Sequence, residues 1–211
     1  MFNVVNGMPT KYIVLYGYDM ADIALFVADA MSRCGKKVIV CDVTAEKTLY
    51  SCFKGSEGEM SPALVGNVLY CCGFNDEWAD VKIICAGFSG LYEYRDCLNF
   101  LVAGYSGAKM MEVKHFADCI AGFDLVVRGE KPSTGPDVNI VSCIDTVGGL
   151  RINNIFEIGN NNDAAIKAEF FGIMDYRAIT REYMNMLEYT ARECGIDEVT
   201  IRKVVRGDYG I

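Results

Sequence analysis

The chain has 211 residues, of which 52% are hydrophobic, and its formal net charge is −8 at pH 7. The length allows one substantial core, and the high apolar content with only four prolines predicts an ordered globular protein. The acidic balance argues against a general nucleic-acid binder, which would carry a basic face for phosphates.

No apolar run reaches the roughly 18 residues that a membrane-spanning helix needs, and the N-terminus has no basic-then-apolar signal peptide. Ten cysteines are many for this length, but they form no C-x-x-C pair, and His115 is the only histidine. Apart from the adjacent Cys71-Cys72 pair, nothing has the spacing of metal ligands. We therefore expect reduced, mostly buried thiols, no bound metal, and a cytoplasmic protein without membrane contact.

Short apolar runs alternate with longer helical patterns along the chain. The runs are apolar at consecutive rather than alternating positions, which is typical of strands covered on both faces of a sheet. The expected strands are Tyr12–Tyr16, Lys37–Cys41, Val65–Cys71, Val81–Cys85, Asn99–Ala103, Phe123–Val127, Val138–Cys143 and Asn154–Ile158. The expected helices are Asp19–Cys34, Tyr92–Asn99, Gly107–Ala121, Asp163–Phe171 and Ile179–Cys194.

This repeated order of strand, helix and strand predicts parallel crossover units. The segment 130–136 contains two prolines and a glycine and is expected to be a long connection, because a strand precedes it and another follows. We predict a single α/β domain over residues 1–211, built on one doubly wound, mostly parallel sheet with helices on both faces.

In open α/β sheets the first strand-to-helix turn is the usual phosphate cradle, which needs helix N–H groups, glycines and a lysine. Here the turn is Gly17-Tyr18-Asp19-Met20-Ala21-Asp22, with no lysine and no Ser or Thr. We expect Asp19 and Asp22 to be helix caps, because carboxylates suit the positive end of a helix dipole. They would also repel a triphosphate, since two unit charges 4 Å apart cost about 4 kcal/mol at an effective dielectric of about 20.

From Lys11 onward, the order of parts resembles the MinD/ParA group of deviant-Walker P-loop ATPases, which have a P-loop NTPase fold. Gly35-Lys36-Lys37-Val38 is similar to the family's G-K-x-V entry to the second strand. By that correspondence Asp42 falls on the family's first switch aspartate, whereas the second switch acid is replaced by Thr44. The resemblance makes Asp42 the only retained acid of this type.

The same resemblance implies that the groups for ATP hydrolysis are missing. Met20 stands at the position of the P-loop lysine, and Asp22 stands at one of two Thr positions, one of which would hold magnesium. The stretch Ala79–Cys85 resembles the Walker-B strand, with Cys85 in place of its aspartate. Phe123–Arg128 resembles the strand that ends in an adenine-reading asparagine, here Arg128. We therefore expect no catalytic residue and no cofactor.

Members of this family dimerise face to face and direct division, chromosome partition or the assembly of flagella and pili. Degenerate P-loops are associated with the TadZ/CpaE pilus-assembly branch. Our leading hypothesis is therefore a non-enzymatic localisation or assembly scaffold that acts as a homodimer and binds protein partners. A second hypothesis keeps weak or atypical ATP and magnesium binding, with the nucleotide held by Gly17, Tyr18, Asp19, Asp42 and Arg128.

A third hypothesis is DNA association through residues 191–207, which resemble a helix-turn-helix with Gly195 in the turn. Three apolar residues would pack its two helices: Ile196, Ile201 and Val204. However, Asp197 and Glu198 lie where a recognition helix should meet phosphates. We therefore expect a closing helix, a capped turn and a short amphipathic tail, and no nucleic-acid partner.

Overall fold

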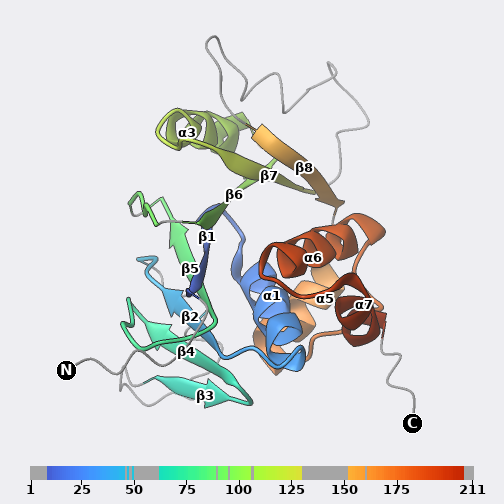
Figure 1. Ribbon diagram of the computed structural model, residues 1–211. Coiled ribbons are helices and arrows are strands. Elements are labelled where there is room, and N and C mark those ends of the chain that lie inside the picture. Colours follow the sequence, from blue (N-terminus) through green and yellow to red (C-terminus); the bar gives the residue numbers. More distant parts are fainter. Residues whose placement is uncertain are drawn as a thin grey trace, which may run out of the picture.

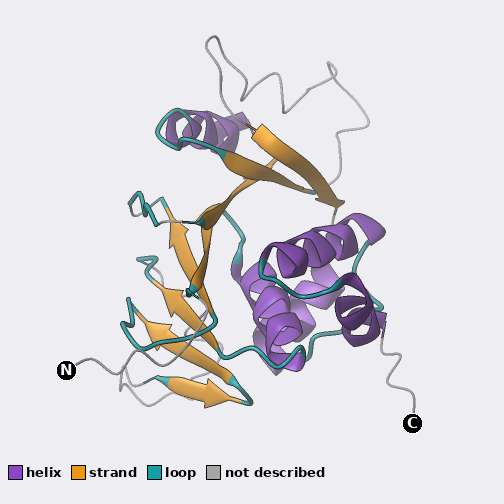
Figure 2. Cartoon of the chain, in the orientation of Figure 1, coloured by secondary structure: helices purple, strands orange, loops and turns teal. Residues whose placement is uncertain are grey.

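The computed structural model describes residues 9–45, 47, 49, 62–88, 90–94, 96–105, 107–129, 152–159 and 161–206. They form a mostly parallel eight-stranded sheet with helices against both of its faces (Figures 1 and 2). The predicted α/β class with one mostly parallel sheet is confirmed. None of the helices in this described part combines the length and apolar character that a bilayer crossing requires.

The strand order is β3-β4-β2-β5-β1-β6-β7-β8, and every neighbouring pair is parallel except β3 with β4. The inner strands are β4 (Val68–Cys72), β2 (Val38–Asp42), β5 (Val81–Gly87), β1 (Lys11–Gly17), β6 (Cys97–Gly104) and β7 (Phe123–Arg128). The outer strands are β3 (Ala63–Val65) and β8 (Ile152–Gly159). Consecutive residues of the inner strands pack alternately into the cores on the two sheet faces.

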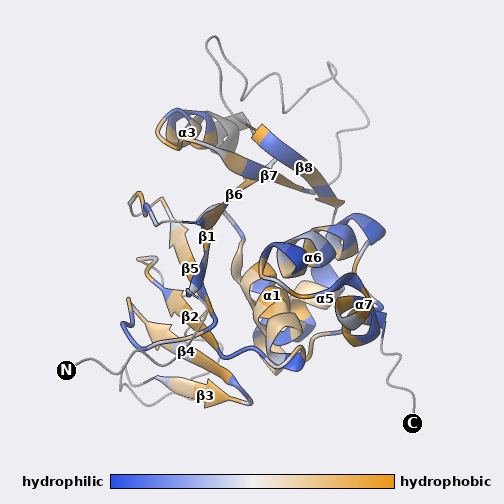
Figure 3. Cartoon of the chain, in the orientation of Figure 1, coloured by the Kyte–Doolittle hydropathy of each residue, from blue (hydrophilic) through white to orange (hydrophobic). Residues whose placement is uncertain are grey.

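One face of the sheet is covered by four helices (Figure 1). They are α1 (Ala21–Arg33), α5 (Asn162–Phe171), α6 (Arg181–Glu193) and α7 (Glu198–Arg206). Helix α1 is almost wholly buried between the sheet and the other helices, and Figure 3 shows it as more apolar than α6. It ends before Gly35, whose φ of +82° is typical of a helix C-terminus.

The opposite face is covered over β6 and β7 by α3 (Gly107–Ala117), shown beside these strands in Figure 1. Val113 and Ala117 of α3 are fully buried against this face. The predicted helix Gly107–Ala121 is therefore present, although it ends four residues earlier. The expected strand 138–143 and the expected connection 130–136 lie outside the described residues.

The predicted strand Val65–Cys71 is wrong in its first residues. Val65 instead ends β3, and a tight turn at Gly66 and Asn67 leads into the antiparallel β4. Gly66 has a φ of +60°, which suits the first central position of a two-residue hairpin turn. The Gly-Asn pair was the sequence signal for this hairpin.

The predicted helix Tyr92–Asn99 is also wrong, because residues 90–94 form no helix and β6 already begins at Cys97. The tyrosines of this segment pack on the sheet instead. The ring of Tyr94 stacks on Tyr12 with a centroid distance of 4.0 Å. The hydroxyl of Tyr16 accepts a hydrogen bond from the Tyr92 N–H at 3.0 Å and donates to the Tyr92 carbonyl at 3.2 Å.

Near the C-terminus the chain forms α6, a turn and α7. Gly195 lies in the turn with a φ of +75°. The three residues expected to pack the helices are buried: Ile196, Ile201 and Val204. Asp197 caps α7, since its carboxylate accepts a hydrogen bond from the Thr200 N–H at 2.9 Å.

Candidate functional site

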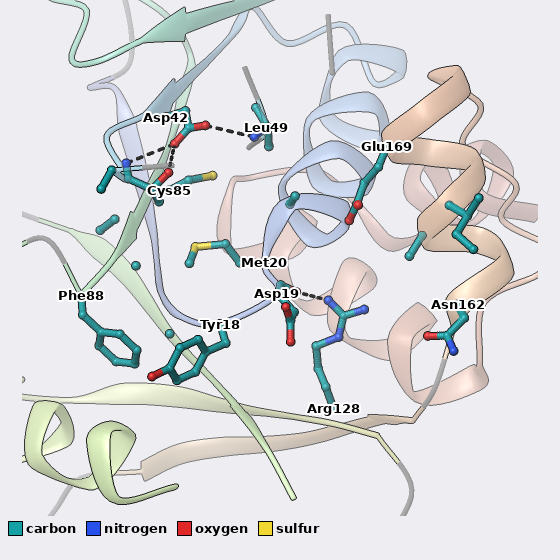
Figure 4. A pocket seen from close by; sticks show the side chains of 18 residues that line it. Tyr18, Asp19, Met20, Asp42, Leu49, Cys85, Phe88, Arg128, Asn162 and Glu169 are labelled. Carbon is teal, nitrogen blue, oxygen red and sulfur yellow. Dashed lines mark hydrogen bonds between the residues drawn. The ribbon is translucent and has the colours of Figure 1, made fainter. Parts of the chain in front are cut away.

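A cavity of about 750 Å³ lies at the carboxyl ends of β1, β2 and β5, beside α1 and α5 (Figure 4). Ligands of open α/β sheets bind at this edge, near the point where connections leave in opposite directions. Here β1 and β6 are neighbours in the sheet. The connection from β1 leads to β2 on one side of this pair, and the connection from β6 leads to β7 on the other side. All five residues predicted for a nucleotide site line this one cavity: Gly17, Tyr18, Asp19, Asp42 and Arg128.

Gly17 is required by a backbone contact within the sheet. Its φ is +105°, and a Cβ at this position would overlap the carbonyl oxygen of Val102 on β6. That oxygen accepts a hydrogen bond from the Tyr18 N–H at 3.4 Å. The ring of Tyr18 packs edge-to-face with Phe88 at 4.9 Å, so the two rings form an aromatic wall of the cavity.

The turn from β1 to α1 differs from the expected one, because neither Asp19 nor Asp22 is the helix cap. The cap residue is Met20, which makes no side-chain cap hydrogen bond. Its thioether is only 7% exposed and points into the cavity in Figure 4. A buried thioether thus occupies the position at which the resemblance implied a P-loop lysine.

Asp22 belongs to a buried polar network instead. Its carboxylate accepts a bidentate pair from Arg128, with Nη1–Oδ1 at 2.6 Å and Nη2–Oδ2 at 3.1 Å. The hydroxyl of Tyr183 donates to the same carboxylate at 3.2 Å. Burial raises the pKa of Asp22, while Arg128 and Tyr183 act in the opposite direction. The network ties α1 to β7 and α6.

Arg128 was expected beside a nucleotide base. Its guanidinium is instead bound to Asp22 and also donates to the carbonyl of Asp19, as the dashed line in Figure 4 shows. Its side chain is 16% exposed, and that of Asp22 is 0% exposed. Freeing the guanidinium for a ligand would leave a buried carboxylate without its counter-ion, which is costly.

Asp42 is buried in the cavity wall, and both of its carboxylate oxygens are engaged by the loop that follows β2. Oδ1 accepts from the N–H and the hydroxyl of Thr44 at 3.1 and 2.5 Å. Oδ2 accepts from the N–H of Leu49 at 3.0 Å. The carboxylate therefore orders this loop, which is a structural role for the residue that the resemblance placed at a switch aspartate.

Cys85, which the resemblance set in place of a Walker-B aspartate, is 1% exposed and lies close to Asp42. Burial, together with the nearby Asp42 carboxylate, raises the pKa of the Cys85 thiol well above its usual range. At neutral pH the group is an uncharged thiol. It cannot replace the negative charge that an aspartate would offer to magnesium.

Glu169 of α5 is a site residue that the sequence reasoning missed. Its side chain points from α5 toward the first turn of α1 (Figure 4), where its carboxylate lies near the backbone of Asp22. Burial, followed by the charge of Asp22, raises the pKa of Glu169. The carboxylate thus takes the place that an anion would occupy at a helix N-terminus. No sequence motif marked it, because its position depends on how α5 packs on α1.

The residues present do not fit a magnesium nucleotide. Among the described residues that line the cavity, Asp19, Asp42 and Glu169 carry carboxylates, and the cation, Arg128, is bound to Asp22. Within the described ranges, no group of three His, Cys, Asp or Glu side chains is placed to hold a metal ion. The cavity is acidic at its mouth and apolar or aromatic at its walls.

Comparison with known protein families, curated proteins and solved structures gives no match for this chain. Its function is therefore inferred from the chemistry of the cavity and its surroundings.

Proposed function

We propose that this chain is a non-hydrolysing protein of the MinD/ParA type, a cytoplasmic homodimer that serves as a localisation or assembly scaffold. On this proposal its activity is the docking of protein partners, as in the TadZ/CpaE pilus-assembly branch. The cavity corresponds in place to the family's nucleotide site but no longer serves nucleotide chemistry.

One observation carries the proposal: the positions that need catalytic groups hold side chains of other chemistry that are already engaged. Met20 is a buried thioether, Asp22 is ion-paired with Arg128, and Cys85 is a buried thiol. Phosphoanhydride cleavage needs charge stabilisation by an ammonium group and a bound cation. These residues supply neither.

Electrostatics work against even passive binding of a triphosphate. Each unit charge placed about 4 Å from a carboxylate such as Asp19 or Glu169 costs about 4 kcal/mol at an effective dielectric of about 20. Recruiting Arg128 as a counter-charge would break a buried ion pair, at a cost of about 3–5 kcal/mol. The atypical-ATPase hypothesis is therefore the less favoured one.

The cysteines agree with a reducing compartment. The eight cysteines within the described residues are free thiols. Burial raises the pKa of Cys41 and of Cys97 to about 11 and that of Cys194 to about 12. Such groups are protonated at neutral pH and behave as small apolar side chains. This use of cysteine is typical of a cytosolic protein.

Isothermal titration with ATP and magnesium tests the proposal. We expect no saturable heat up to about 1 mM nucleotide, a limit set by a binding free energy weaker than about −4 kcal/mol. Light scattering coupled to gel filtration should show a dimer whether or not nucleotide is present. Tight, saturable ATP binding or ATP turnover would overturn the non-hydrolysing assignment, and a monomer would overturn the homodimer.

A further inference from the structure

Helix α5 has its small and large side chains in an unusual arrangement. Its buried residues are Ala164 and Ala168, and it packs on α1. Its large apolar residues face outward: Ile166 is 49% exposed and Phe170 is 75% exposed. A helix that only covered the core would show the reverse pattern. Outward-facing large apolar side chains that lie together mark an interaction surface.

This apolar surface continues into the cavity. Ile166 lines the cavity, and Phe170 lies one helical turn further along the same face of α5. Two more exposed apolar residues lie at the same end of the helix, Phe171 and Ile173, with exposures of 69% and 56%. We call these four residues, Ile166, Phe170, Phe171 and Ile173, the α5 strip. Its cavity end is next to Glu169.

The side chains where the α5 strip meets the cavity carry negative charge. Asp19 and Glu169 lie at the cavity beside the α5 strip, and the guanidinium of Arg128 is bound to Asp22. The aromatic wall of Tyr18 and Phe88 lines the same cavity as these carboxylates. Carboxylates beside aromatic rings suit an organic cation, which gains from both the charge and the rings.

We propose that the cavity and the α5 strip together bind a segment of a partner protein that carries an arginine or lysine next to apolar residues. The basic side chain enters the cavity between Asp19 and Glu169, and the apolar side chains lie on Ile166 and Phe170. This inference rests on the proposed function, because it requires that the cavity is not used by a nucleotide.

The occupant is a different chain rather than a second copy of this one. A two-fold axis through the cavity mouth would bring Glu169 and Asp19 of the two copies together, and like charges at an interface are repulsive, so the proposed homodimer uses another face. The carboxylates equally disfavour an anionic lipid surface. The complementary partner has positive charge and apolar side chains.

Fluorescence anisotropy with short labelled peptides tests the inference. The probes are Gly-Leu-Arg-Phe-Leu-Gly, the same peptide with Lys for Arg, and the same peptide with Glu for Arg. We expect the basic peptides to bind the wild-type chain at least about tenfold more tightly than the Glu peptide. Glu169→Gln and Phe170→Ser should each weaken the basic peptides at least about fivefold. The matched controls Asp118→Asn and Leu64→Ser, both exposed and outside α5, should stay within about twofold.

The inference is overturned if no basic peptide binds, or if the Glu peptide binds as well as the Arg peptide. It is also overturned if Glu169→Gln leaves peptide binding unchanged, provided that circular dichroism shows this variant to be folded. Sedimentation with phosphatidylserine vesicles is a further test. If the wild-type chain sediments with the vesicles and Phe170→Ser does not, the α5 strip binds a membrane instead. The ATP titration separates the two proposals. Loss of peptide binding with no ATP binding removes only this inference, whereas tight ATP binding removes the proposed function as well.

Discussion

The backbone of Gly17 lies so close to β6 that any side chain at this position would meet the carbonyl oxygen of Val102. In the sequence the same glycine reads as a residue of a phosphate-binding loop. Both roles need the absence of a Cβ, so the residue type alone does not separate them. The contact with Val102 accounts for the glycine without any ligand.

Gly17→Ala should therefore lower the free energy of unfolding by at least about 3 kcal/mol, since the new methyl group overlaps backbone and the left-handed φ adds strain. Urea denaturation measures the loss. Gly35→Ala is the matched control, because Gly35 also has a positive φ but has no atom within 4 Å of the added Cβ. It should cost only about 1–2 kcal/mol. Equal losses in the two variants would contradict this account.

Asp124 of β7 is 1% exposed, and its carboxylate accepts a hydrogen bond from the Asn154 side chain at 2.7 Å. Burial raises the pKa of Asp124, while Asn154 and Tyr189 act in the opposite direction. A raised folded-state pKa contributes stability that is fully present below the unfolded value of about 3.9 and is lost as pH rises through the folded value.

Asp124→Asn removes this titration and keeps an acceptor oxygen for Asn154. The variant should therefore gain stability relative to the wild type as the pH rises from acid to neutral. Urea denaturation of both chains across this range gives the comparison. Stability differences that do not change with pH would show that Asp124 does not titrate with a raised pKa.

At the scale of elements, the network of Asp22, Arg128 and Tyr183 joins three parts that are far apart in the chain, α1, β7 and α6. The sequence shows each of these residues at the end or on the inner face of an expected element. It contains no sign that they meet, because the pairing depends on the angle between the helices and the sheet. For the same reason Asp22 was expected to be a helix cap.

Arg128→Met should cost about 3–5 kcal/mol, because it leaves the carboxylate of Asp22 buried without its counter-ion. The triple variant Asp22→Leu, Arg128→Met, Tyr183→Phe removes all the polar groups together and should recover most of that loss. Chemical denaturation compares the two. If the triple variant were as unstable as the single one, the loss would come from packing of the Arg128 stem rather than from charge.

Most of the elements could be predicted from the sequence, because continuous apolar runs and helical spacing act locally. The β3–β4 hairpin had a local signal in its Gly-Asn pair, whereas the wrong helix at 92–99 has a tertiary cause. Residues 92–99 contain apolar and aromatic residues at spacings that fit a helix, but Tyr94 is held on Tyr12 and Tyr92 on Tyr16 by contacts across the sheet. Tertiary contacts of this kind override local preference. Glu169 was missed for the same reason.

At the scale of the whole molecule, charge opposes the DNA hypothesis although α6 and α7 are two helices joined by a turn. The net charge is −8, and Asp197 and Glu198 lie at the start of α7. Arg202, which would face phosphates, is held by acids of its own chain. Its Nε lies 3.4 Å from Glu188, and its Nη2 pairs with Glu198.

We therefore expect no mobility shift of a duplex of about 30 base pairs at about 50 mM salt, where phosphate contacts are strongest. The single variant Glu198→Lys, which adds positive charge to the start of α7, is a useful comparison. Even this variant should bind only weakly, because the rest of the chain stays acidic. A shift by the wild-type chain that disappears with rising salt would restore DNA association as a function.

The three-residue β3, with its antiparallel course, has a further consequence at one border of the sheet. A strand of another molecule would find few backbone N–H and C=O groups on β3 with which to pair. The protein should therefore resist polymerising through β3 at high concentration. Removing β3 would uncover the five-residue β4, whose exposed border could then recruit other molecules into fibres.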